Sequence, residues 1–253
     1  MFMSKRHMEL KINYLRYRLS IIPHGYFASF KGNSVVYVFY DPDDDRISYR
    51  NKRKYFCSGR KGRSLSEQIK EYVELKGQLD LLLKEWKAQY QGEPRNIPFP
   101  LFKRRIGPID HDFFVKAEPN QVEHRDDKYI DHKGQELISK NEEVVAQILE
   151  KMGYEFKAGI FLDLDKFTHL HPDFLFYVPE IDKVILIEVD GAMDKEFYVT
   201  KSYYSTASCL INGFIEMKDF VVVRIGHGYE INSEQIEGML WAAIDMAIDD
   251  IVI

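Results

Sequence analysis

The 253-residue chain is mildly acidic, with 40 Asp and Glu residues against 35 Lys and Arg residues and a net charge of -5. Its hydrophobic content of 45% is enough for one large or two small folded domains and excludes a disordered chain. No apolar run approaches the ~20 residues of a membrane helix, and the first residues lack a secretion signal. With only Cys57 and Cys209, neither a disulfide framework nor a cysteine-based zinc site is expected. We therefore expect a folded cytoplasmic protein with no membrane partner.

The first 92 residues predict a small α+β region. A helix is expected over 8–22, followed by strands over 26–30, 35–40 and 47–49 that are separated by polar turns. The pattern Ser64-Leu-Ser-Glu67 is typical of a capping box and predicts the start of a long helix that ends near Gly92. Residues 93–130 contain five prolines without a clear period, which predicts a connector to a domain over 131–253.

A basic stretch runs from Arg46 to Arg63 without an acidic residue and includes three aromatic residues. Such a patch can bind phosphates even on an acidic protein. The alternative is a solvated hairpin edge whose cations prevent pairing with other strands. The predicted nucleic-acid-binding residues are Arg50, Lys52, Arg53, Lys54, Arg60, Lys61 and Arg63.

The last 120 or so residues alternate strands and helices, which predicts an α/β domain with a mixed central sheet flanked by helices. Helices are expected over 137–151, 195–211 and 233–248, and strands over 154–157, 160–164, 172–178, 183–190 and 220–225. The strand–helix–strand order from Val184 to Ile225 predicts a right-handed crossover and parallel pairing.

Two of these strands place carboxylates where a sheet does not favour them. If the turn of the hairpin is 179–182, Asp173 lies directly opposite Glu188, and Asp190 points to the same side. Like charges at opposite positions of two strands destabilise a sheet. A divalent cation relieves this repulsion, and Mg²⁺ prefers oxygen ligands. The ordinary alternative is that Asp173 caps its own turn and Glu188 reaches solvent.

A third carboxylate lies on the apolar side of the helix expected over 137–151. Ile138, Val145, Leu149 and Met152 form its apolar stripe, and Glu142 completes their spacing. An isolated buried charge is unfavourable, so Glu142 is expected to be paired, protonated or close to a metal.

These residues resemble the motifs of the PD-(D/E)XK nuclease superfamily, especially its branch related to very-short-patch repair endonucleases. The matching segments are Ser139-Lys-Asn-Glu142, Pro172-Asp173, Glu188-Val-Asp190-Gly191 and Val221-Val-Val-Arg224. The resemblance covers about residues 131–230 and implies a restriction-endonuclease-like core, preceded here by the small α+β N-terminal region. It also implies a Mg²⁺- or Mn²⁺-dependent endonuclease that acts on DNA.

The resemblance also implies roles for particular residues. Asp173, Glu188 and the backbone carbonyl of Val189 would bind the metal, and Glu142 would bind or orient a second metal or its water. Asp190 stands where the superfamily has a lysine, so the general base stays open: Lys201, or a water held by Glu142 or Asp190, would take the proton.

Two other functions are compatible with the sequence. The first is a catalytically degenerate nuclease fold that binds nucleic acid as an adaptor in a larger DNA-processing complex, either as a homodimer or with a partner protein. The second is an iron or zinc enzyme in which His169, His171 and Asp173, at a period of two, form the metal site.

Overall fold

The computed structural model describes residues 3–39, 52–118, 129–131, 136–163, 169–191, 196–225 and 231–252. The chain forms two compact units, a smaller one of residues 8–100 and a larger one of residues 1–7 and 101–253. This division differs from the expected boundaries at 92 and 131, because part of the expected connector belongs to the larger unit. Ile109 and Phe114 are buried in the hydrophobic core of that unit.

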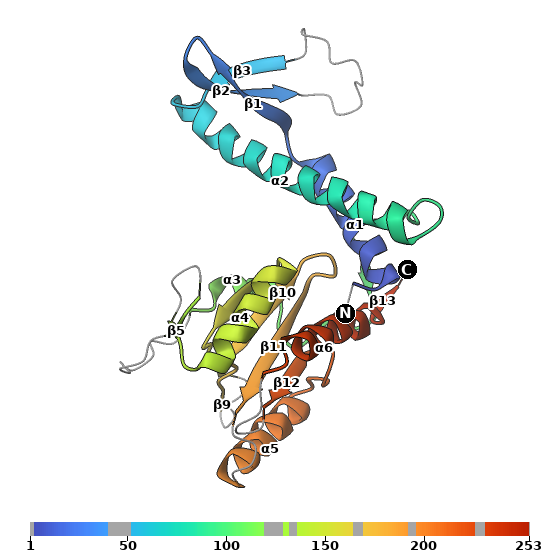
Figure 1. The fold of residues 1–253 in the computed structure, drawn as a ribbon, viewed down its shortest axis with the longest axis vertical. Coiled ribbons are helices and arrows are strands. Elements are labelled where there is room, and N and C mark those ends of the chain that lie inside the picture. Colours follow the sequence, from blue (N-terminus) through green and yellow to red (C-terminus); the bar gives the residue numbers. More distant parts are fainter. Residues whose placement is uncertain are drawn as a thin grey trace. The chain divides into compact units, whose positions relative to one another are not determined.

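The smaller unit contains an antiparallel three-stranded sheet and a long helix (Figure 1). Its elements are α1 (Lys5–Ile21), which begins in the larger unit, β1 (His24–Phe30), β2 (Asn33–Phe39), β3 (Lys52–Phe56) and α2 (Arg60–Gln89). The strand order is β1-β2-β3. Ile69 of α2 packs against Val36 and Val38, so α2 covers one face of this sheet. The strand expected over 47–49 lies outside the described residues.

The start of α2 corrects the sequence prediction. The helix begins at Arg60 with Gly59 as its N-cap, one turn before the capping box expected at Ser64. A Cβ at Gly62 would lie 1.9 Å from the carbonyl oxygen of Phe56. Gly62 therefore allows the first turn of the helix to approach the end of β3, and this tertiary contact decides where the helix starts.

The larger unit has the predicted α/β arrangement. Its elements in chain order are β4 (Phe102–Lys103), α3 (His111–Lys116), β5 (Tyr129–Ile130), β6 (Glu136–Leu137), α4 (Lys140–Met152), β7 (Glu155–Ala158), β8 (Leu162–Asp163), β9 (His169–Leu170), β10 (Phe174–Val178), β11 (Lys183–Asp190), α5 (Glu196–Ile211), β12 (Phe220–Arg224), α6 (Ser233–Ile248) and β13 (Ile251–Val252). The helix bounds of α5 and α6 are within a residue of those expected, and Asn232 caps α6 as its sequence predicts.

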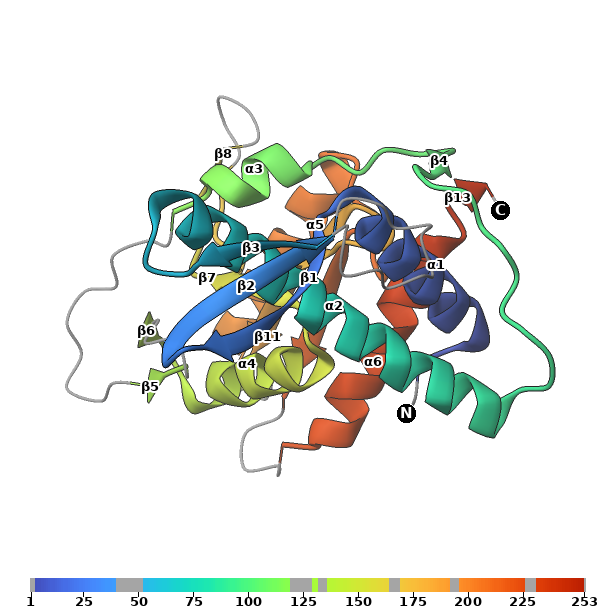
Figure 2. The same cartoon turned by 90° about the horizontal axis from the view of Figure 1, so that it is seen from above.

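The central sheet is mixed, with the strand order β12-β11-β10-β7. β11 and β12 are parallel, which confirms the predicted parallel pairing, while β10 is antiparallel to both β11 and β7. One face carries a core that includes Phe114 of α3 and Cys209 of α5. On the other face, Trp241 of α6 contacts the ring of Tyr154, which in turn contacts Phe176 of β10. Figure 2 shows α3 and α4 on opposite sides of this sheet.

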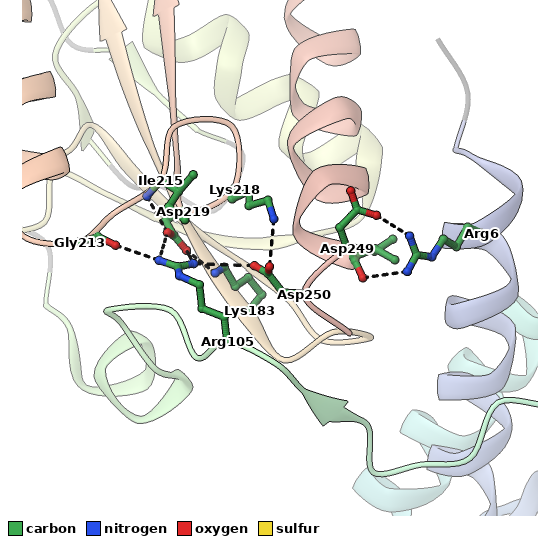
Figure 3. Close-up of polar contacts among 10 residues, drawn as sticks. Arg6, Arg105, Lys183, Gly213, Ile215, Lys218, Asp219, Asp249 and Asp250 are labelled. Carbon is green, nitrogen blue, oxygen red and sulfur yellow. Dashed lines mark hydrogen bonds and ion pairs between the residues drawn. The ribbon is translucent and has the colours of Figure 1, made fainter. Parts of the chain in front are cut away.

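A network of buried charges lies at the start of β11 (Figure 3). The Lys183 ammonium and the Arg105 guanidinium both donate hydrogen bonds to the carboxylate of Asp219, which is 1% exposed. Burial by itself would raise the pKa of Asp219, but the hydrogen bonds from Arg105 and Lys183 outweigh it and lower the pKa. Burial also lowers the pKa of Lys183, and the nearby Asp219 opposes this shift. Every charge in this network therefore has a partner of opposite sign.

The N-terminal residues are fixed to the larger unit by polar contacts. Arg6 forms an ion pair with Asp249 (Figure 3). The His7 ring contacts the carboxylate of Glu180, which also accepts a hydrogen bond from the hydroxyl of Tyr154 at 2.7 Å. The N-terminal residues of the larger unit thus contact residues that are far from them in the sequence. None of the described helices combines the length and the apolar character that a bilayer crossing requires.

We predict that Asp219→Asn destabilises the larger unit by about 3–5 kcal/mol, because the substitution removes the carboxylate that pairs with the buried Lys183 and with the partly exposed Arg105. Urea unfolding monitored by circular dichroism measures the change. The matched control is Asp182→Asn, which removes an exposed ion pair with Lys103 and should change the free energy of unfolding by less than about 1 kcal/mol. Equal changes in the free energy of unfolding for the two substitutions would show that the network around Asp219 does not stabilise the larger unit.

Candidate active site

The pairing of β10 with β11 brings two carboxylates to opposite positions. Phe174 pairs with Ile187, so the next positions outward along the ladder are Asp173 and Glu188. The predicted register is therefore confirmed. Because side chains alternate between the faces of a sheet, both acids lie on the face that also carries Leu186.

Burial raises the pKa of both carboxyl groups. The pKa of Asp173 rises to about 7, mainly through burial and then through the negative charges of Glu142 and Asp190. The pKa of Glu188 rises to about 8, mainly through burial and then through the charge of Asp173. Glu142, Asp173, Glu188 and Asp190 thus belong to one electrostatic site at the carboxyl end of β11.

Three groups partly offset this negative charge. The backbone amide of Val189 donates a hydrogen bond to Oδ2 of Asp173 at 2.5 Å, and the Ser205 hydroxyl donates one to Oε1 of Glu188 at 3.0 Å. The positive charge of Lys201 lowers the pKa of both acids. Lys201 is exposed on α5, so its ammonium is both accessible to a substrate and close enough to interact with the pair.

Glu142 is buried, as its sequence position predicts, and its carboxylate accepts hydrogen bonds at the start of α4. Ser139 is the N-cap of α4, and the two side chains form a capping box. The Glu142 amide donates to the Ser139 hydroxyl at 3.3 Å, while the Glu142 carboxylate accepts from the Ser139 hydroxyl at 3.0 Å and from the Ile138 amide at 2.9 Å. Ile138 is 39% exposed; placing it on the apolar stripe was wrong because it precedes the helix.

The inner side of α5 supplies hydroxyl groups that the sequence prediction missed. Besides the contact from Ser205 to Glu188, the Ser202 hydroxyl donates a hydrogen bond to Asp190. Ser202, Ser205 and Cys209 follow a three–four spacing, the signal by which they could have been found. Cys209 is buried beside the site, and burial together with the charge of Glu188 raises the pKa of its thiol to about 12.

The donor set of this site fits a hard cation. Within the described residues, no three His, Cys, Asp or Glu side chains form a ready-made metal-binding group. Mg²⁺ nevertheless commonly uses only one or two carboxylates and keeps several waters, and Asp173 and Glu188 supply two. In a strand, the N–H and C=O of one residue point to the same neighbouring strand. The carbonyl of Val189 therefore faces the side on which its amide binds Asp173.

The structure gives no support to a two-histidine metal set. His171 is exposed, and its ring lies 5.0 Å from that of Phe161. The side chain of His169 lies outside the described residues. Asp173 instead directs an oxygen to the amide of Val189.

The described members of the predicted nucleic-acid-binding stretch are exposed in the smaller unit. They are Arg53, Lys54, Arg60, Lys61 and Arg63. Lys54 lies over the ring of Phe30 at 3.2 Å from its centre, and Lys61 lies over Tyr55 at 5.3 Å. Arg50 and the side chain of Lys52 fall outside the described part of the chain.

Comparisons of the chain with protein-family models, with curated proteins and with solved structures find no match. The function must therefore be inferred from the residues and the geometry of the site.

We predict that the metal-free protein becomes more stable when the pH is lowered from about 8.5 to about 5.5. The usual pKa values of the two carboxyl groups are 3.8 and 4.5, against about 7 and 8 in the fold. Between these values the folded protein keeps protons that the unfolded chain has released, so a lower pH favours folding. Glu188→Gln should raise the free energy of unfolding by roughly 1–3 kcal/mol near pH 8.5 and by much less near pH 5.

Thermal and urea unfolding at both pH values, with a chelator present, measure this effect. Glu155→Gln, which changes an exposed acid on β7, serves as the control and should shift stability equally at both pH values. The same behaviour for Glu188→Gln would show that the fold does not raise the pKa of Glu188.

Proposed function

We propose that the protein is a nuclease that hydrolyses phosphodiester bonds in DNA with Mg²⁺ or Mn²⁺ as its cofactor. The observation that carries this proposal is the pair of Asp173 and Glu188, which lie opposite each other, half-buried and with raised pKa values, beside Lys201. A folded protein gains no stability from two adjacent half-buried acids, whereas a hard cation needs such ligands.

We also infer that the larger unit has a restriction-endonuclease-like core. The support is the mixed sheet, in which the antiparallel hairpin β10–β11 is followed by a helix and a parallel strand. The motif residues of the resemblance fall at matching places. Asp173 comes directly before β10, Glu188 and Asp190 lie at the end of β11, and Glu142 lies in the first turn of α4.

Each residue of the site has a distinct role in this proposal. When bound, the metal neutralises charge on the scissile phosphate and activates water. Asp173 and Glu188 would hold it, and their hydrogen bonds from Val189 and Ser205 fix one oxygen of each carboxylate. This leaves the other oxygen of each group for the cation.

Lys201 would bind the phosphate rather than the metal. Its ammonium is exposed on α5 and interacts with both acids. A positive charge at this place stabilises the negative charge that develops on the phosphate in the transition state. Glu142 and Asp190, at the rim of the site, would orient the attacking water and accept its proton.

We predict that Asp173→Asn and Glu188→Gln each reduce DNA cleavage by roughly 10²–10³-fold, because each removes a ligand of the cation. The assay uses plasmid, linear duplex and single-stranded DNA with Mg²⁺ or Mn²⁺. Binding of Mn²⁺, followed by electron paramagnetic resonance, should weaken in the same variants. Asp182→Asn, at an exposed acid in the hairpin turn, is the control and should leave both readouts unchanged. Cleavage that persists in both site variants would overturn the proposal.

We predict that Lys201→Gln lowers the cleavage rate roughly a hundredfold while Mn²⁺ binding persists, because this ammonium acts on the phosphate. Lys201→Arg keeps the positive charge and should retain part of the activity. Lys151→Gln, which changes an exposed lysine of α4, is the matched control. If Lys201→Gln behaves like Lys151→Gln, the lysine is only a solvated surface charge.

Two observations favour a second candidate, a catalytically degenerate nuclease fold that binds DNA as an adaptor. The carboxylate of Glu142 is engaged in a capping box, and Asp190 occupies the position of the usual lysine. For an adaptor, DNA binding would persist and depend strongly on salt while no divalent cation supports cleavage. Asp173→Asn would then strengthen DNA binding by removing a negative charge.

A further inference from the structure

The sheet of the smaller unit has one face that α2 does not cover. Gly25 faces α2, since a Cβ at this position would lie 2.7 Å from Cδ1 of Ile69. Side chains alternate along a strand. Tyr26, next to Gly25, and Tyr37, next to Val38, therefore point away from α2, and we call the face that carries them the open face.

The open face carries aromatic rings in an ordered arrangement. Tyr26 of β1, Tyr37 of β2 and Lys54 of β3 occupy one row across the sheet. The rings of Tyr26 and Tyr37 are stacked, with centroids 5.1 Å apart. Phe56 lies two residues beyond Lys54 on the same face and is 45% exposed, while Tyr26 is 37% exposed. Large aromatic side chains are thus presented to solvent on a rigid sheet.

Positive charge accompanies these rings. The ammonium of Lys54 lies 3.2 Å from the ring centre of Phe30 and 5.8 Å from that of Phe56. Lys31, in the turn between β1 and β2, also lies over Phe30 at 5.7 Å. Residues 24–39 and 52–63 contain no Asp or Glu. The loop between β2 and β3, which includes Asp41, Asp43, Asp44 and Asp45, lies outside the described residues.

We propose that this open face binds an unpaired segment of a DNA strand, with bases stacked on Tyr26, Tyr37 and Phe56 and phosphates paired with Lys54. Exposed rings suit unpaired bases because every base offers a flat face for stacking, whereas the bases of a duplex are already stacked on each other. The cations supply the charge complementarity that a strand of phosphates requires. A surface that recognises only the phosphates of a duplex requires cations but no exposed aromatic rings.

This inference deepens the proposed function, because it rests on DNA as the polymer that the protein binds. It does not depend on catalysis. It also assigns a role to one residue of the basic stretch: Lys54 attracts phosphates on the open face, while the aromatic rings beside it select for unpaired bases.

The test measures binding of labelled oligo-dT of about 20 nucleotides and of a duplex of equal length by fluorescence anisotropy, with EDTA present to prevent cleavage. The full chain should bind the single strand more tightly than the duplex. Tyr26→Thr and Phe56→Thr keep a residue that favours strands and should each weaken single-strand binding by roughly five- to a hundredfold. Lys54→Gln should weaken it and reduce the salt dependence by about one phosphate contact.

Phe27→Thr is the matched control. Phe27 neighbours Tyr26, points to the opposite face of β1 and is 41% exposed, so its replacement should leave binding unchanged. Circular dichroism and thermal unfolding establish that the variants fold. Equal binding of single strand and duplex, or equal effects of Tyr26→Thr and Phe27→Thr, would overturn the inference.

Failure of this inference can be told apart from failure of the proposed function. The binding assay contains no divalent cation, and Asp173→Asn should not weaken single-strand binding. If Asp173→Asn loses cleavage while Tyr26→Thr leaves single-strand binding unchanged, the nuclease proposal stands and the stacking site is rejected. If Asp173→Asn keeps cleavage while Tyr26→Thr weakens single-strand binding, the stacking site stands and the nuclease proposal is rejected.

Discussion

Repulsion between the carboxylates of Asp173 and Glu188 is the interaction on which the candidate site depends. The two acids face each other because the antiparallel register of β10 and β11 leaves no other arrangement. Burial first, and the charges of neighbouring acids second, raise the pKa values of both groups, so the fold disfavours their charged forms. An uncompensated pair of this kind is a recognised mark of a functional site, since catalytic groups and metal ligands need charges that a purely structural core would avoid.

The charged side chains at the two ends of β11 differ in how far their charges are paired. At its start, Lys183 is paired with Asp219, which also binds Arg105. At its end, Glu188 is offset by a serine hydroxyl and by one exposed lysine. The first arrangement satisfies every charge and contributes to the stability of the unit. The second leaves the two acids without a full counter-charge, at the carboxyl end of an inner strand where helix α5 brings polar groups toward them.

Glu142 both caps a helix and affects the electrostatics of the candidate site. Its carboxylate accepts two hydrogen bonds that close the start of α4, and its charge also raises the pKa of Asp173. A capping carboxylate is favourable at the N-terminus of a helix because the first amides have no partner within the helix. The helix start therefore stabilises a negative charge beside the site.

The sequence alone determined the element types of the larger unit, the register of β10 with β11 and the burial of Glu142. These follow from local patterns, because a short turn fixes a hairpin register and a helical period fixes which side chains face the core. Only the tertiary structure decided where α2 begins, how the chain divides near residue 100 and that Ser202 and Ser205 bind the acids of β11. Such contacts join elements that are separate in the sequence, and the sequence does not show how close these elements come in space. The contacts form only when the helices pack on the sheet.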